Sequence, residues 1–257
     1  MNNNIIYEQP TNEIIRLLMK LEYLLSKYKF HYSQTSIWSI KEAINTLFEF
    51  TELSSRNNIK LVLLKEISLS KDLLVKLEQN GYIDENTFKK YNLILSEQEN
   101  KIHQLKDNIF NKILENEFAL SIKNKAYFPA GDNFFDLPSY LNFLTFNKNK
   151  IYTSLDTWFE NYPVINDTIN AILELKRRSS SFEECVAVDG FYEVNYDKNL
   201  NLEIIRIKMD KDMNIYPIVS LNNRKISILF KMLASQDLIP KKISNDISFS
   251  YSCIFKI

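Results

Sequence analysis

Glycine is nearly absent from this sequence: of 257 residues, only Gly81, Gly131 and Gly190 are glycine. A dinucleotide-binding fold or a P-loop needs clustered glycines, because the backbone must approach a phosphate closely. The three glycines are far apart in the chain. Both classes of nucleotide-binding protein are therefore excluded.

Histidine and cysteine are also scarce, with two residues of each. His31 and His103 lie in no recognisable nucleophile, base or metal motif, and the spacing of Cys185 and Cys253 matches no CxxC or zinc pattern. Adjacent acids such as those at 183–184 would point to opposite faces of a strand, whereas paired-carboxylate catalysis needs them to converge. We therefore expect no catalytic residue, no metal site and no cofactor, with both cysteines reduced and half-buried.

The chain has no excess of charge of one sign, because 32 basic side chains balance 32 acidic ones. Such a chain has no overall field that would attract a nucleic acid or an anionic membrane. No apolar run approaches the roughly 18 residues that a membrane helix needs, and residues 1–10 lack the pattern of a secretory signal. We expect a cytoplasmic protein with no nucleic-acid partner and no membrane partner.

The composition is that of a folded globular protein, with 45% hydrophobic and 25% charged residues. From residue 11 to about residue 180, apolar residues recur at steps of three and four, which predicts amphipathic helices. The first expected helix follows Pro10. The others cover residues 37–53, 58–81, 84–114, 137–144, 150–161 and 163–179.

Several residues mark where these helices begin and end. Ser36 and Asp84 are suited to cap helix N-termini, and Gly81 is suited to the left-handed position after a helix C-terminus. Asp136 is expected to cap the helix that follows it, with Pro138 in the first turn.

The helix expected at 84–114 is unusually long, about 45 Å at 1.5 Å per residue. Its apolar seam alternates three- and four-residue steps, as in a coiled coil, at Phe88, Tyr91, Leu95, Gln98, Ile102, Leu105 and Ile109. Two interpretations stay open. The helix forms a hairpin with the preceding helix, or it protrudes as an arm or a dimer contact.

After residue 180 the period changes to two. Ile205, Ile207 and Met209 face one way, while Arg206 and Lys208 face the other. The same alternation at 226–232 and 249–255 predicts antiparallel strands, and residues 5–7 predict a short strand that joins the same sheet. The predicted fold class is α+β: a helical bundle domain at 11–180, inserted into an antiparallel β-sheet domain formed by 1–10 plus 181–257.

Basic residues near the ends of the expected elements are candidates for a binding surface. They are Arg16 and Lys20 on the first helix, Arg56 in the loop after the second, Arg177 at the end of the last helix, and Arg224 and Lys225 at the start of a strand. Taken singly, each is more simply a solvated surface charge. If the fold brings several together, they form a basic groove that attracts an acidic peptide.

Five blocks of sequence resemble, in the same order, the ZapD family of bacterial cell-division proteins over nearly the whole chain. They are Tyr7-Glu8-Gln9-Pro10 with Asn12, Glu13, Arg16, Lys20 and Glu22; Leu63-Leu64-Lys65-Glu66; Pro129-Ala130-Gly131 with Phe135-Asp136-Leu137-Pro138; Asp189-Gly190-Phe191-Tyr192; and Tyr216-Pro217.

This resemblance implies a helical domain plus a β-domain, and a homodimer that is not an enzyme. It also implies binding to the acidic and apolar C-terminal tail of the tubulin-like protein FtsZ, whose filaments the dimer would cross-link at midcell. Basic positions that the family uses for binding or bundling fall here on Lys20, Arg56 and Lys225. Other charged family positions fall on Glu117 and Leu141, where this chain departs from the pattern.

Three other functions compete with this one. A nucleic-acid-binding module would use Arg177, Arg178, Arg224 and Lys225 on a β-surface, but a net charge near zero and the missing Gly-rich aromatic signature argue against it. A scaffold for another acidic partner and an enzyme with an unrecognised site are the remaining alternatives.

Overall fold

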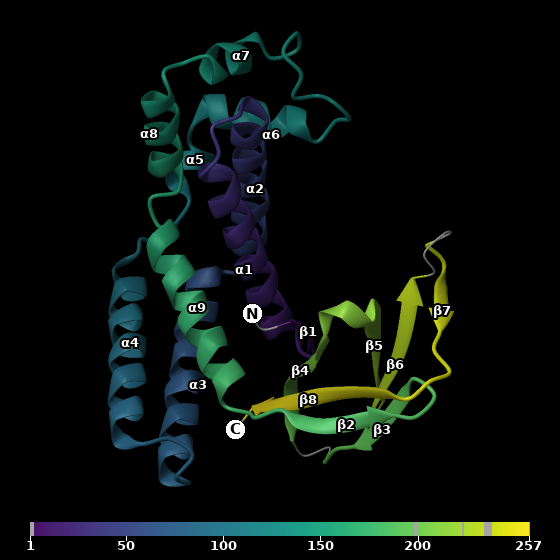
Figure 1. Cartoon of the computed structure of the whole chain (residues 1–257). Helices are drawn as coiled ribbons and strands as arrows, with labels where there is room; N and C mark the ends of the chain where they lie inside the picture. Colours follow the sequence, from purple (N-terminus) through teal and green to yellow (C-terminus); the bar gives the residue numbers. More distant parts are fainter. Residues whose placement is uncertain (1–2, 198–199, 223, 234–237, 257) are drawn as a thin grey trace. The chain divides into compact units, whose positions relative to one another are not determined.

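The computed structural model of the chain describes residues 3–197, 200–222, 224–233 and 238–256 (Figure 1). Helices fill the N-terminal part and antiparallel sheets the C-terminal part, so the predicted α+β class is confirmed. The chain divides into two compact units. Unit 1 comprises Met1–Leu17, Asp72–Ile83 and Glu174–Ile257, and unit 2 comprises Leu18–Lys71 and Asp84–Leu173. The domain boundaries at residues 10 and 180 stay a prediction.

The strands of unit 1 form two antiparallel sheets. Sheet A has the order β1-β4-β8-β2, with β1 at Asn4–Pro10, β4 at Asn201–Asp210, β8 at Ile247–Lys256 and β2 at Glu183–Ala187. Sheet B has the order β3-β6-β5, with β3 at Phe191–Asn195, β6 at Lys225–Leu233 and β5 at Ile215–Asn222; β7 at Pro240–Lys242 also pairs with β6. The 3-10 turn η1 covers Lys211–Met213.

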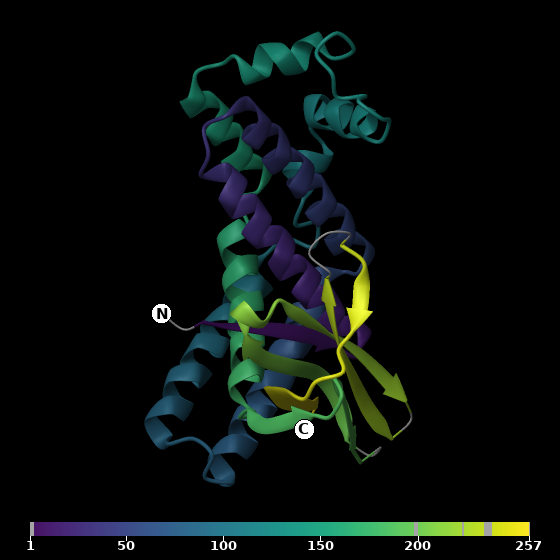
Figure 2. The same cartoon turned by 45° about the vertical axis from the view of Figure 1, so that its right-hand side comes forward.

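The N-terminal strand joins sheet A, as predicted. β1 pairs with β4 along its whole length, from Asn4 opposite Asp210 to Pro10 opposite Ile204. Figure 2 shows β1 crossing beside the strands from the C-terminal part of the chain. Every α-helix among the described residues therefore lies, in sequence, between the first strand of the sheet and the other strands.

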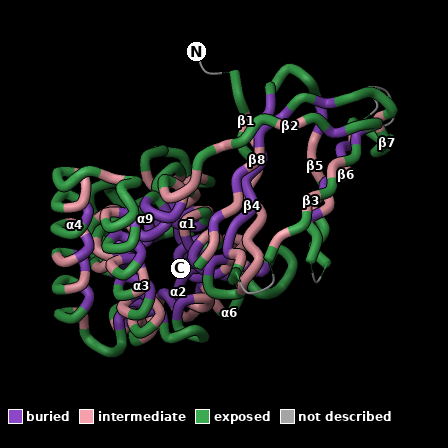
Figure 3. The backbone as a smooth tube through the Cα atoms, turned by 90° about the horizontal axis from the view of Figure 1, so that it is seen from below, coloured by how far each residue is buried: buried purple, intermediate pink, exposed green. Residues whose placement is uncertain are grey.

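The two sheets share one apolar core. The residues that alternate inward on β4 and β6 are all buried in it: Ile205, Ile207, Met209, Ile226, Ile228 and Phe230. Figure 3 shows buried segments along β4, β8 and β6. Unit 1 is thus a β-sandwich whose two sheets bury their inner faces against each other.

The described helices cover most of the first 178 residues. Their bounds are α1 Glu13–Tyr32, α2 Ile37–Arg56, α3 Ile59–Gln79, α4 Glu85–Gln104, α5 Asn111–Leu114, α6 Glu117–Ala126, α7 Pro138–Leu144, α8 Lys148–Trp158 and α9 Tyr162–Arg178. In the part of the chain that the structure describes, no helix is long and apolar enough to cross a lipid bilayer.

Most of the predicted helix ends are confirmed. The Ser36 side chain accepts a hydrogen bond from the Ser39 amide, and the Asp84 side chain accepts one from the Thr87 amide. Gly81 follows α3 with a φ of 72°, the left-handed conformation that glycine adopts most readily.

The predicted cap at Asp136 is wrong. α7 begins at Pro138, as expected, but Leu137 precedes it and no side chain caps the helix. Asp136 instead belongs to a turn organised by Asn133, whose Oδ1 accepts hydrogen bonds from the amides of Phe135 and Asp136.

The single long helix predicted at 84–114 is also wrong. α4 ends at Gln104, because the Leu105 backbone is extended, with φ −64° and ψ 140°. The Lys60 ammonium group stabilises this break: Nζ lies 2.6 Å from the Leu105 carbonyl oxygen and 3.1 Å from a carboxylate oxygen of Asp107. α5 is therefore a separate short helix.

The structure supports the hairpin interpretation of α4. Lys71 on α3 forms an ion pair with Glu99 on α4, with a distance of 2.6 Å, and Figure 1 shows the two helices side by side. Gln98 in the apolar seam of α4 is buried and accepts a hydrogen bond from Thr168 on α9. The seam thus packs within the same chain.

Candidate functional site

The six predicted contact residues are divided between the two units. Unit 1 contains Arg16, Arg177, Arg224 and Lys225, whereas unit 2 contains Lys20 and Arg56. Within unit 1 only Arg224 and Lys225 are adjacent, at the turn that leads into β6.

Arg177 is committed to an internal ion pair. Its Nη2 lies 2.7 Å from Glu8 Oε2 on β1, and Arg206 Nε on β4 lies 2.9 Å from Glu8 Oε1. Arg206 also donates a hydrogen bond to the Arg177 carbonyl oxygen at the C-terminal end of α9, and its guanidinium group lies over the Phe182 ring. This cluster fastens β1 and β4 to the end of α9.

A second ion pair lies deeper, one residue earlier on α9. Lys176 Nζ is 2.6 Å from Glu203 Oε2, and the two side chains are only 4% and 3% exposed. A buried pair of this kind holds its geometry tightly, since separating the charges would leave one of them unpaired away from water. Neither residue can contact a partner.

Lys225 is exposed but already paired. Its Nζ lies 2.6 Å from Glu193 Oε1 on β3, and Ser227 donates a hydrogen bond to the other carboxylate oxygen. The hydrogen bond from Lys225 lowers the pKa of Glu193 below its usual value. Arg224, exposed in the turn, accepts a backbone hydrogen bond from Tyr196. An acidic ligand at Lys225 would therefore compete with Glu193.

Arg56 was predicted to lie in a loop, but it is the last residue of α2. Its side chain is 74% exposed and pairs with Glu52, one turn earlier on the same helix. The Tyr127 hydroxyl donates a hydrogen bond to the same carboxylate, which lowers the pKa of Glu52. Arg56 resembles Lys225 in this respect: each is an accessible cation held by a neighbouring carboxylate.

Arg16 and Lys20 differ in how far they are engaged. Arg16 Nη2 donates a hydrogen bond to the Pro10 carbonyl oxygen at 3.1 Å, and Nε lies 3.6 Å from Glu13. Lys20, one turn later on α1, is exposed, and within the described ranges no ion pair to it occurs. Lys20 and Arg224 are therefore the two of the six cations that form no ion pair with the described residues.

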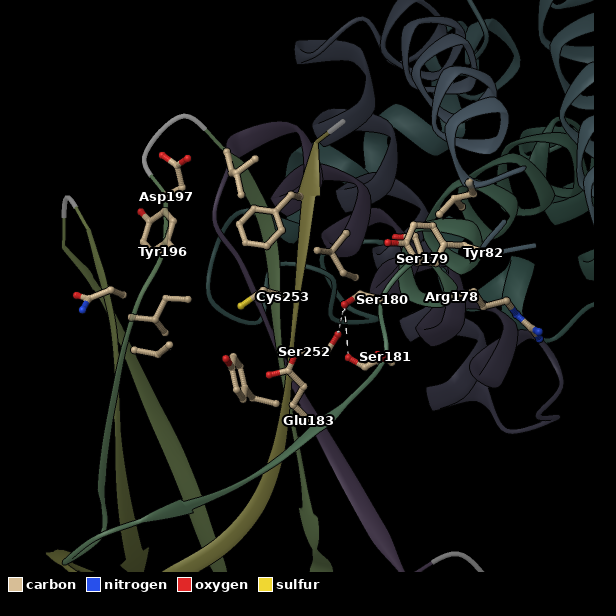
Figure 4. Close-up of a pocket in the computed structure, with 18 of the residues that line it drawn as sticks. Tyr82, Arg178, Ser179, Ser180, Ser181, Glu183, Tyr196, Asp197, Ser252 and Cys253 are labelled. Atoms are coloured by element: carbon tan, nitrogen blue, oxygen red, sulfur yellow. Dashed lines mark hydrogen bonds between the residues drawn. The ribbon is translucent and has the colours of Figure 1, made fainter. Parts of the chain in front are cut away.

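A groove in unit 1 that the sequence did not indicate has a volume of about 710 Å³. Figure 4 shows Tyr196 and Asp197, which follow β3, on one side of it, and Ser252 and Cys253 of β8 facing them. The segment 179–181 completes the wall, and the Ser252 hydroxyl donates a 3.0 Å hydrogen bond to the Ser180 hydroxyl.

The groove is poorly suited to an acidic ligand, because Glu183 and Asp197 both line it. Arg178 also lines it, but Arg178 forms an ion pair with Glu174 at 2.9 Å. Burial raises the pKa of the Cys253 thiol to about 12, so the thiol stays protonated and weakly nucleophilic at neutral pH.

The histidines and cysteines lie as the sequence suggested. His103 is exposed on α4, and His31 packs edge-on against the Phe30 ring, with the ring centroids 5.1 Å apart. Cys185 and Cys253 are free thiols and partly buried. Among the described residues, no group of three or more histidine, cysteine, aspartate or glutamate side chains could hold a metal ion.

These features define a class: an α+β protein in which a long helical insertion separates the first strand from the rest of an antiparallel β-sandwich. A family model described as "ZapD: Cell division protein" matches residues 19–229. The chain therefore belongs to the ZapD family of cell division proteins, and the predicted resemblance is confirmed.

Curated relatives cover almost the whole chain. A protein named "Cell division protein ZapD" from Methylococcus capsulatus is 28% identical over 250 residues, which are 97% of this chain and 97% of the relative. A protein of the same name from Coxiella burnetii is 26% identical over 250 residues, again 97% of each chain.

Proposed function

We propose that this protein is a non-catalytic, cytoplasmic cell-division factor. It binds the acidic C-terminal tail of FtsZ and, as a homodimer, cross-links and bundles FtsZ filaments in the division ring at midcell. The observation that carries the proposal is the match of residues 19–229 to the ZapD cell-division family.

Exposed cations in both units support an acidic partner. The basic positions that the family resemblance marks are all exposed: Lys20, Arg56 and Lys225. Each single contact with a tail carboxylate would be weak, because exposed ion pairs contribute little free energy. A filament repeats its tail along its length, so a dimer with two sites gains avidity through effective concentration.

A sedimentation assay tests the proposal directly. Polymerised FtsZ from the same organism, with and without its C-terminal tail, is pelleted with and without this protein. The protein should co-pellet only with the tailed filaments, and light scattering or negative-stain images should show bundles. Pelleting that is equal with tailless filaments, or absent with both forms, would overturn the proposal.

The nucleic-acid alternative is weakened by the ion pairs of three of its four residues. Arg177 is held by Glu8, Arg178 by Glu174 and Lys225 by Glu193. A gel-shift experiment with generic DNA and RNA at low salt separates the two functions. A scaffold for a different acidic partner would ignore FtsZ and still bind an acidic ligand in a salt-dependent way.

A further inference from the structure

A second hollow, in unit 2, has the opposite character to the groove of unit 1. It is about 590 Å³ in volume, and residues at the start of α6, in α7 and the turn after it, and in α8 line it. Figure 1 labels these three helices. This volume is typical of pockets that bind a ligand group rather than a water molecule.

Aromatic rings form its floor. Phe143 stacks on Trp158, with ring centroids 5.9 Å apart and an interplanar angle of 23°. Phe118 lies against both rings, 5.2 Å from Phe143 and 6.3 Å from Trp158. Phe143 and Trp158 are each 6% exposed, so the rest of the helical core fixes the floor in place.

The rim is neutral except for one cation. Lys150 is the sole charged side chain among the described residues that line the hollow, and the other polar ones are amides and hydroxyls such as Asn149 and Thr153. Lys150 Nζ lies 5.9 Å from the Phe146 ring centroid, and that ring is 44% exposed. Aromatic side chains such as the Phe146 ring are enriched at protein-binding surfaces.

This arrangement selects one kind of ligand. The hollow accepts a bulky apolar or aromatic side chain, because such a side chain would cover the exposed Phe146 ring and remove its surface from water. Lys150 favours a carboxylate beside that side chain, whereas exposed Glu117, at the start of α6, disfavours one at the other end. The ligand is therefore an acidic peptide segment with one bulky apolar anchor, oriented with its carboxylates towards α8.

We propose that this aromatic hollow holds an apolar side chain of the FtsZ tail, next to a tail carboxylate that pairs with Lys150. This inference rests on the proposed function and adds an apolar anchor to a contact otherwise carried by exposed charges. Affinity then depends on the bulky apolar residues of the tail as well as on its charge.

Tryptophan fluorescence gives a local readout, because the chain has two tryptophans and one lies in the hollow. Trp38 is 70% exposed, so Trp38→Phe leaves Trp158 as the reporter without disturbing the core. The full-length protein with this substitution is titrated with a synthetic peptide of the FtsZ tail. A second peptide has its bulky apolar residues replaced by serine and its acids retained. Anisotropy of dye-labelled peptides measures affinity independently.

Two variants and two controls complete the experiment. Phe146→Ala and Lys150→Glu alter the rim of the hollow, whereas Phe30→Ala and Lys101→Glu remove an exposed ring and reverse an exposed charge elsewhere. The tail peptide should change Trp158 emission saturably. Phe146→Ala should weaken binding about tenfold, as should the serine peptide, and Lys150→Glu should weaken it several-fold. The controls should bind as the parent does.

Tail binding with unchanged affinity in Phe146→Ala and Lys150→Glu, together with silent Trp158 emission, would overturn the inference and leave the proposed function standing. Absence of tail binding in both assays, with no co-sedimentation, would overturn both. An equal loss of tail affinity in the two variants and the two controls would mean that exposed charges and rings act non-specifically. That result would also contradict an apolar anchor in the hollow.

Discussion

At the scale of residues, two of the three basic positions that the family resemblance marks are held by carboxylates of the same chain. Arg56 pairs with Glu52 and Lys225 with Glu193, while Lys20 has no such partner in the part of the chain described. An acidic tail must therefore exchange with a resident carboxylate at two of the three positions. This exchange favours a ligand with several carboxylates over one with a single charge.

Charge reversal tests the three cations. Lys20→Glu, Arg56→Glu and Lys225→Glu should each weaken binding of the FtsZ tail, and the triple variant should abolish co-sedimentation, because attraction becomes repulsion at every position. The loss should be largest for Lys20, which is the freest of the three. Lys101→Glu, on the exposed side of α4, is the matched control. Equal binding by the triple variant would exclude these residues as contacts.

Removing the resident carboxylates should have the opposite effect. Glu52→Gln and Glu193→Gln free Arg56 and Lys225 without changing side-chain size, so tail affinity should rise by no more than about fivefold each. Fluorescence anisotropy measures this gain. A fall in affinity would show that the carboxylates position the cations rather than compete for them.

The buried ion pair between Lys176 on α9 and Glu203 on β4 should contribute to the stability of the fold and not to binding of a partner. Glu203→Ala leaves the Lys176 ammonium group without this partner in an interior site, and should lower the free energy of unfolding by about 3–5 kcal/mol. The double variant Lys176→Met with Glu203→Leu should recover most of this loss, because apolar groups tolerate the site. Urea unfolding followed by circular dichroism measures both. Equal destabilisation by the single and double variants would contradict this account.

The sequence could not reveal these charged clusters. The alternation of β4 placed Arg206 on the face opposite the core, where a solvated side chain was the natural expectation. Arg206 is buried there because the β1–β4 register puts Glu8 directly opposite it and α9 brings Arg177 to the same carboxylate. Partners so distant in sequence follow from the register of two strands, which a single sequence does not specify.

At the scale of elements, the sequence predicts the end of a helix correctly where residues within one turn determine that end. Ser36, Asp84 and Gly81 predicted helix ends correctly, because caps depend on hydrogen bonds within one turn. The break at Leu105 was missed because Lys60, from α3, stabilises it through a tertiary contact. The groove and the aromatic hollow were missed for the same reason: their walls come from separate elements.

The N-terminal cap of α4 should make a pH-dependent contribution. Hydrogen bonds from the Thr87 amide lower the pKa of Asp84, so this carboxylate stabilises the folded state fully above its unfolded pKa of about 4. The stabilisation is lost as the pH falls through the lowered folded pKa. The difference in urea midpoint between the parent and Asp84→Ala should therefore be clear near neutral pH and shrink as the pH falls through the lowered folded pKa of Asp84. A difference that is constant with pH would contradict an ionised cap.

At the scale of the whole molecule, the proposed function depends on charge and on two tail sites per dimer. Binding carried by exposed charges should weaken by more than about tenfold as salt rises from about 0.1 M to about 1 M, where the Debye length shortens from about 10 Å to about 3 Å. Sedimentation and anisotropy across a salt series measure this. The apolar anchor should leave a residual, salt-independent affinity that Phe146→Ala removes, and unchanged affinity across the series would exclude the charge mechanism.

The order of strands in sheet A has a consequence for synthesis on the ribosome. Glu8 of β1 and its partner Arg206 of β4 lie 198 residues apart in sequence, so β1 leaves the exit tunnel roughly 10–40 s before β4 at about 5–20 residues per second. β8, which lies between β4 and β2, emerges later than either. During this interval β1 has no β4 to pair with, and Ile5 and Tyr7 lack the apolar core against which they pack in the folded protein, so the strand is open to pairing with another chain.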